Sequence, residues 1–182
     1  LAAAVGLYLL VFDGEQGQAV YSAARDGTQA QIVHRHAQQM VSHSPLLSKE
    51  CKINQTTGRI VYQKNAAHYS ILAGDNIPSQ EGLNGSVIID EIHVVDDRLA
   101  IVLADIGASR SEPLQFQIST AGAGFESYGR KEYEYGKQVE AGIIEDQAYY
   151  FRAYEAPQSS TDDQLADQST WASANPAWGQ LI

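Results

Sequence analysis

Two acidic residues, Asp90 and Glu91, lie at the end of an apolar, β-branched run within residues 86–93. Such a run predicts a strand that is buried on both faces of a sheet and whose carboxyl end opens onto a polar site. Neighbouring carboxylates at that position can hold a metal cation and accept a proton, which is the chemistry of a hydrolytic site. The structural alternative is that the acids only cap the next helix.

This pattern resembles the Walker B segment of nucleoside triphosphatases, in which an apolar strand delivers Asp and then Glu. The resemblance implies that Asp90 holds a magnesium ion, usually through water. It also implies that Glu91 orients or deprotonates the water that attacks the γ-phosphate of ATP.

A second polar pair, Ser119 and Thr120, follows the next expected strand, residues 114–119. In many motor ATPases a small polar segment on the strand beside Walker B senses the γ-phosphate and couples hydrolysis to movement. Because the carboxyl ends of parallel strands meet at one edge, we expect this pair to lie near Asp90 and Glu91.

The rest of the chain alternates strand and helix patterns. Helices are expected over residues 1–12, from Asp26 or Thr28 to about Ser42, from Asp96 and Asp97 onward, and over about 127–141. Strands are expected at residues 18–23, 69–73, 114–119 and 148–154, with a hairpin at 52–63. The alternation predicts the α/β class, a three-layer sandwich with a mostly parallel central sheet.

The amino-acid composition limits the kinds of partner that the chain is expected to bind. The chain has 12 basic and 22 acidic residues and a net charge of -10. An acidic domain repels phosphate backbones, so any DNA-binding surface is expected elsewhere in the assembly, although the charge can also serve solubility alone.

The single cysteine, Cys51, excludes an internal disulfide and fits a reducing cytoplasm. The apolar start is shorter than the roughly 20 residues that span a bilayer, so no membrane partner is expected. His34 and His36, two apart, are assigned to a solvated helix surface rather than to a ligand pair.

In the order and spacing of its segments, the chain resembles the ATPase domain of the large terminase subunit of tailed bacteriophages, which packages DNA into proheads. The resemblance covers nearly the whole chain. The matching segments are residues 1–4 (LAAA), 20–24 (VYSAA) with 29–30 (QA), 82–84 (GLN), 87–93 (VIIDEIH), 118–122 (ISTAG), and Trp171 with 174–176 (ANP).

The resemblance implies a P-loop NTPase fold of the ASCE type and Mg²⁺-ATP hydrolysis coupled to DNA translocation. It assigns Asp90 to the metal, Glu91 to general-base catalysis, and Ser119 and Thr120 to the nucleotide as the coupling segment. The implied partners are ATP, DNA, the portal and the small terminase subunit, in a motor that can be oligomeric and that acts in the cytoplasm of the bacterial host.

The sequence departs from the family in lacking a G-x-x-x-x-G-K-[ST] loop, which the family places just before the segment that matches Leu1. We therefore expect a fragment without its phosphate-loop segment, with residues 1–155 as the ATPase core and 156–182 as a C-terminal extension. We also expect this chain to be without the family's C-terminal nuclease domain, and the isolated chain not to hydrolyse ATP. Arg98 and Arg110 are expected on the surface rather than as arginine fingers.

Two rival interpretations stay open at this point. The chain could be a non-catalytic remnant that serves as a protein-interaction module. It could also be a fragment of a superfamily 2 helicase, because those enzymes use an Asp-Glu-x-His strand and a Ser-Ala-Thr-like segment. Their upstream motifs are not found here, and the net charge of -10 opposes the basic surface that a helicase needs.

Overall fold

The computed structural model describes residues 1–73, 83–108, 110–122, 126–157 and 160–179. The chain divides into two compact units, Leu1–Glu132 and Tyr133–Ile182. In the part of the chain that is described, no helix is both long and apolar enough to cross a membrane. The apolar start of the chain forms the expected helix, α1 (Ala2–Val11), of ten residues, and all three of its leucines are buried.

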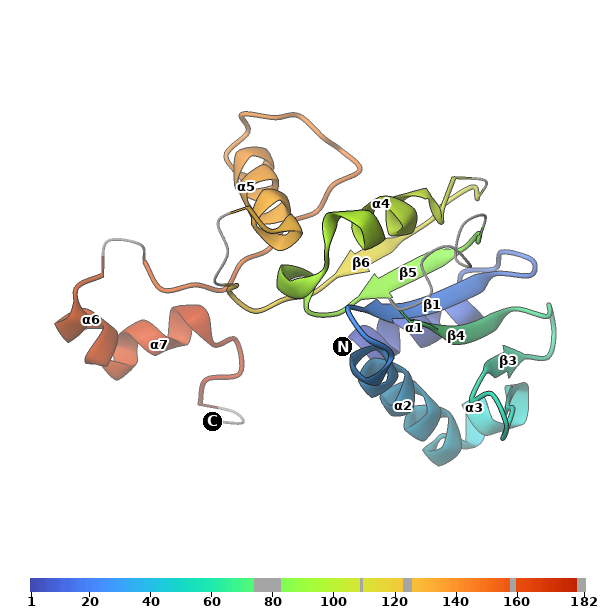
Figure 1. Ribbon diagram of the computed structural model, residues 1–182. Helices are drawn as coiled ribbons and strands as arrows, with labels where there is room; N and C mark the ends of the chain where they lie inside the picture. Colours follow the sequence, from blue (N-terminus) through green and yellow to red (C-terminus); the bar gives the residue numbers. More distant parts are fainter. Residues whose placement is uncertain (74–82, 109, 123–125, 158–159, 180–182) are drawn as a thin grey trace. The chain divides into compact units, whose positions relative to one another are not determined.

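A six-stranded sheet in the order β2-β3-β4-β1-β5-β6 organises the first unit (Figure 1). Neighbouring strands pair in parallel from β4 through β1 and β5 to β6, whereas β2, β3 and β4 pair antiparallel. The parallel strands therefore end at one common edge. The strands are β1 (Ala19–Ala24), β2 (Cys51–Ile53), β3 (Ile60–Tyr62), β4 (His68–Ala73), β5 (Ser86–Ile89) and β6 (Gln115–Gln117).

Helices cover both faces of the sheet and complete three layers. On one face, α1 and α2 (Gly27–His43) pack on a buried cluster that includes Val20, Tyr69 and Ile88. On the other face, α4 (Asp97–Asp105) packs on a cluster that includes Val87 and Ile89. Alternate side chains of each central strand pack into one cluster and then the other, as expected for strands that are buried on both faces. The predicted α/β sandwich is thus confirmed.

The local signals that begin the helices act as expected. Asp26 caps α2 by accepting hydrogen bonds from the backbone N–H groups of Thr28 and Gln29, and Asp96 caps α4 through the N–H of Leu99. Pro45 follows α2 and stands at the first position of a further helix, α3 (Pro45–Glu50). Proline is tolerated there because that N–H has no intrahelical partner.

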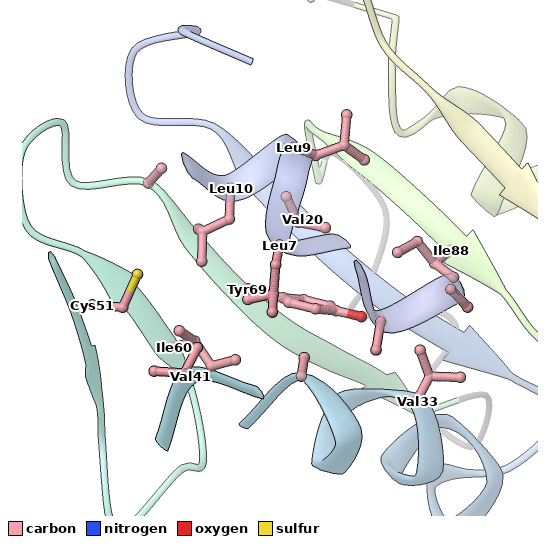
Figure 2. Packing of buried hydrophobic residues seen from close by; sticks show 14 residues of the cluster. Leu7, Leu9, Leu10, Val20, Val33, Val41, Cys51, Ile60, Tyr69 and Ile88 are labelled. Atoms are coloured by element: carbon pink, nitrogen blue, oxygen red, sulfur yellow. The ribbon is translucent and has the colours of Figure 1, made fainter. Parts of the chain in front are cut away.

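Tyr69 lies at the centre of the first cluster (Figure 2). Its hydroxyl is 2.6 Å from the Ser22 hydroxyl, and burial raises the pKa of its phenol to about 12. His34, expected on the surface, is instead 1% exposed, with Nε2 3.2 Å from the carbonyl oxygen of Tyr69. The prediction was wrong for His34 because α2 lies directly on β4, and a spacing of two residues turns one histidine inward. His36 is exposed as expected.

Two predicted strands differ from the structure. The strand expected at 114–119 is limited to β6 and is partly exposed rather than buried. The strand expected at 148–154 is wrong, because those residues belong to no strand. Their alternating pattern has another origin: Tyr149 and Phe151 pack edge-on against Tyr135 and Tyr133 of α5 (Tyr128–Glu140).

The second unit contains the C-terminal part of α5 together with α6 (Asp162–Ala166) and α7 (Gln168–Ala174). Trp171 anchors the last two helices, because its indole N–H donates to the carbonyl oxygen of Leu165 at 2.7 Å and its ring meets Trp178 edge-on. The compact units divide within α5. The expected limits of the ATPase core, residues 1–155, and of the extension, 156–182, stay a prediction.

Candidate active site

The carboxyl ends of β1, β5 and β6 bring the candidate residues together. Hydrogen bonds continue across the sheet beyond the strands: Asp90 N–H donates to the carbonyl oxygen of Ala23 at 3.0 Å, and Ile118 N–H to that of Ile89 at 3.0 Å. The chain segments that carry Asp90 and Ser119 therefore leave the sheet side by side. The expected juxtaposition of the two acids with the Ser-Thr pair is present in the structure.

Glu91 has an unusual backbone conformation that fixes where its side chain lies. Its φ is 55° and its ψ is 50°, in the left-handed region. A non-glycine residue there costs roughly 1–2 kcal/mol, so the conformation must be imposed by its surroundings. The turn ends β5 and leads directly into a short 3₁₀ helix, η2 (Ile92–Val94). The strand that was expected within residues 86–93 is thus limited to β5 (Ser86–Ile89).

One of the two Glu91 carboxylate oxygens is held by a hydrogen bond and by the close approach of His93. Oε2 lies 3.0 Å from Nδ1 of His93 and accepts from the Thr120 hydroxyl at 3.3 Å. Within the described residues, no hydrogen bond to Oε1 is found. One oxygen is therefore anchored while the other can accept a proton from a water molecule.

Ser119 links the end of β6 to His93. Its hydroxyl donates to the carbonyl oxygen of Thr120 at 3.0 Å, which uses its only proton. It accepts from the backbone N–H of His93 at 3.2 Å and lies 2.9 Å from His93 Nδ1. With the Ser119 proton given to the Thr120 carbonyl, Nδ1 is the donor to Ser119 Oγ, and the Glu91 carboxylate lies 3.0 Å from the same nitrogen.

Asp90 lies beside this network in a partly buried position. Desolvation raises the pKa of its carboxyl above 3.8, the neighbouring Glu91 charge raises it further, and a hydrogen bond from the Glu91 backbone lowers it. A carboxylate whose ionised form is under-stabilised gains from a bound cation. The donor set fits Mg²⁺, which commonly takes one or two carboxylates and completes its shell with water and phosphate oxygens. No group of three or more potential metal ligands occurs among the described residues.

Two glycines allow close packing around His93. A Cβ at Gly122 would lie 2.7 Å from the Cβ of His93, and a Cβ at Gly129 would lie 2.8 Å from its Cα. Gly129 is in the first turn of α5, which is also held by Gln117, whose side chain donates to the Tyr128 hydroxyl at 2.7 Å. His93 is thus enclosed by the segment after β6 and by the start of α5.

Sequence reasoning did not assign a role to His93, Gly122 or Gly129. The Asp-Glu-x-His spacing was the one available signal for His93. Gly122 lies in the segment 118–122 that carries the family resemblance, but nothing in the local sequence shows that either glycine meets His93, because that approach is a tertiary contact between distant segments.

Arg110, expected on the surface, is mostly buried at the opposite end of the parallel strands. Its side chain is 15% exposed, lies 3.4 Å from a Glu15 carboxylate oxygen and donates to the carbonyl oxygens of Gln16 and Gly17. A pocket of about 340 Å³ next to it is lined by Gly85 and residues of α4 and the loop before β6. Arg110 therefore ties loops together away from the candidate site.

One family of known proteins matches most of the chain. The family model "Terminase large subunit, ATPase domain" matches residues 1–138. The chain belongs to this family. The resemblance predicted from the sequence is confirmed, and the helicase interpretation is set aside. A search of curated proteins found no match.

Solved terminase structures share the fold. The crystal structure of the HK97 bacteriophage large terminase matches with a TM-score of 0.83 and 24% identity, over 99% of this chain and 37% of that one. The large terminase of a thermophilic bacteriophage in complex with ADP matches with a TM-score of 0.56 and 12% identity, over 77% of this chain and 34% of that one. The complex of the same terminase with ATP-gamma-S matches with a TM-score of 0.54 and 12% identity, over 77% and 33%. The chain thus spans about a third of the terminases that it matches.

Proposed function

We propose that this chain forms part of the ATPase of a viral DNA-packaging motor, in which ATP hydrolysis drives DNA translocation. The observation that carries the proposal is the constellation at the ends of β5 and β6, where Asp90 and Glu91 stand beside Thr120 and Ser119. Membership of the terminase ATPase family supports the same activity.

In this proposal Glu91 is the general base. Its anchored Oε2 fixes the orientation of the carboxylate, and its other oxygen takes the proton from the attacking water. Asp90 holds Mg²⁺, which when bound neutralises charge on the phosphates. Ser119 and Thr120 form the coupling segment, because a change in their position alters the hydrogen bonds to His93 and Glu91.

The phosphates of ATP need a further contact that the sequence does not offer in its familiar form. No G-x-x-x-x-G-K-[ST] loop occurs in it. We therefore propose that Asp90, Glu91 and the coupling segment supply the metal and water side of the site. The 182 residues on their own are expected to show no ATP turnover.

The wider assembly follows from the same proposal. DNA, the portal and the small terminase subunit are the partners, in an oligomer that works in the cytoplasm of the bacterial host. A chain with a net charge of -10 is poorly suited to grip DNA, so we place the DNA-binding surface outside it.

The test is a Glu91→Gln substitution in the protein as its gene encodes it, assayed with Mg²⁺, ATP and DNA. Removing a general base should lower the rate of hydrolysis by at least about 100-fold, while calorimetry shows unchanged Mg²⁺-ATP binding. Glu112→Gln, at an exposed glutamate outside the site, is the matched control and should hydrolyse ATP at the wild-type rate. Wild-type turnover by Glu91→Gln would remove Glu91 from the mechanism. A protein that neither binds nor hydrolyses ATP would favour the non-catalytic interaction module.

A further inference from the structure

We propose that His93 is the positioning residue of this site: it holds the Glu91 carboxylate in its working orientation and connects it to Ser119. The inference rests on the proposed function, since it concerns the base of that reaction. The contacts that carry it are those of Nδ1, 3.0 Å from Glu91 Oε2 and 2.9 Å from Ser119 Oγ.

The proton balance of the network places a proton on His93 Nδ1, next to the Glu91 carboxylate. Ser119 gives its hydroxyl proton to the carbonyl oxygen of Thr120 and receives the backbone N–H of His93. Nδ1 therefore donates to Ser119 Oγ, and Glu91 Oε2 lies 3.0 Å from the same nitrogen, where the N–H dipole attracts the carboxylate. With the Thr120 hydroxyl donating to Oε2, this oxygen is anchored from two sides and Oε1 is left for the water.

The surroundings of His93 allow the ring little freedom. Its backbone N–H is bound to Ser119, its Cβ faces Gly122 and its Cα faces Gly129 at the start of α5. The left-handed backbone of Glu91 sets where its side chain starts, and the 3.0 Å contact with His93 Nδ1 holds the carboxylate at its end. His93 supplies that contact from two residues further along the chain.

One consequence concerns coupling. Ser119 binds both the backbone and the ring of His93, so a shift of the segment after β6 displaces the ring and changes the orientation of Glu91. In this way the position of the Ser-Thr segment sets whether the base is aligned. A misplacement of about 1 Å at a reacting group can cost about 100-fold in rate.

The test compares two substitutions of nearly equal shape in the protein as its gene encodes it. His93→Asn keeps an amide N–H near the position of Nδ1, whereas His93→Leu has no polar atom. We expect His93→Leu to lower kcat for ATP hydrolysis by about 100-fold with KM unchanged, and His93→Asn to recover most of the loss. His36→Ala, at the exposed histidine of α2, is the control and should leave kcat and KM at wild-type values.

A double-mutant cycle separates positioning from a general structural role. In a Glu91→Gln background, His93→Leu should cause no further loss, because the group that it orients is already disabled. Equal losses in both backgrounds, a rise in KM alone, or identical kcat for His93→Asn and His93→Leu would overturn the proposal. If circular dichroism shows that His93→Leu does not fold, the test uses His93→Asn and Ser119→Ala instead. A wild-type kcat for Ser119→Ala together with an about 100-fold loss of kcat for His93→Asn would overturn the positioning role of His93.

The two proposals fail in different ways. If Glu91→Gln keeps wild-type turnover, the proposed function fails regardless of His93. If Glu91→Gln is inactive while His93→Leu is fully active, the ATPase assignment stands and only the positioning role is lost.

Discussion

At the scale of single residues, the site keeps two carboxylates in different environments. Glu91 has one oxygen anchored by His93 and Thr120, whereas the pKa of Asp90 is raised, first by desolvation and then by the Glu91 charge. An anchored carboxylate suits a base that must keep its orientation. A partly desolvated one favours a cation, because the cation offsets the lost hydration and the repulsion between the acids.

The raised pKa of Asp90 predicts a stability change. The folded protein binds more protons than the unfolded chain between pH 3.8 and the raised value, so stability falls as the pH rises through this window and the loss persists above it. Asp90→Asn should therefore melt at a higher temperature than the wild type at about pH 7 without divalent cations. The advantage should disappear as the pH falls toward 3.8.

Thermal unfolding followed by circular dichroism at several pH values measures this difference. Asp105→Asn, at an exposed aspartate at the end of α4, is the control and should melt like the wild type throughout. An Asp90→Asn variant that is less stable than the wild type at neutral pH would show that the ionised carboxylate is stabilised rather than penalised.

At the scale of elements, β5, β6, η2 and the start of α5 position the site together. The parallel register of β5 and β6 pairs Ile89 with Gln117, so both strands end at the same level. The first turn of α5 then lies against η2, where Gly129 faces the backbone of His93. Lys131 of the same turn makes a 2.7 Å ion pair with Asp97 of α4.

This packing predicts whether a Gly129→Ala substitution raises or lowers the free energy of unfolding. In a helix with free space around the glycine, alanine stabilises by about 1 kcal/mol. Here the new methyl group would meet His93 Cα at 2.8 Å and His93 N at 2.9 Å. We expect a loss of about 1–3 kcal/mol in the free energy of unfolding, measured by urea denaturation, together with reduced ATP turnover. A stabilised variant would mean that α5 does not rest on His93.

Much of this element structure could be predicted from the sequence, and the failures have physical causes. Caps such as Asp26 and the β-branched run into Ile89 are local signals, so α2 and β5 were predictable. The segment around Tyr149 and Phe151 shows the same alternation as a strand, but its period comes from packing on α5. In the site, the two acids and the Ser-Thr pair were predictable from strand ends. The position of His93 beside Glu91 and Ser119 was not, because it depends on how η2 turns.

At the scale of the whole molecule, family membership and net charge both bear on which part of a terminase this chain supplies. The chain matches the terminase ATPase family over residues 1–138 and spans 37% of the HK97 large terminase. Its net charge of -10 is unfavourable for contact with DNA. In our proposal the chain is the ATPase part of a motor, and the DNA contacts lie outside it.

This division predicts that the 182 residues alone do not bind duplex DNA. Fluorescence anisotropy with a labelled duplex of about 30 base pairs at about 0.15 M salt should show no saturable binding, because few phosphates can be neutralised. Binding in the micromolar range that weakens as salt is added would place a DNA-binding surface on this chain.

The most direct test of the central claim is a crystal structure of the Glu91→Gln protein, as its gene encodes it, with Mn²⁺ and ATP. Anomalous scattering from Mn²⁺ locates the metal without reference to the protein density. We expect one manganese peak beside Asp90, with the γ-phosphate facing residue 91 and the segment of Ser119 and Thr120. A metal and nucleotide bound elsewhere, such as near Arg110 at the opposite end of the strands, would contradict it.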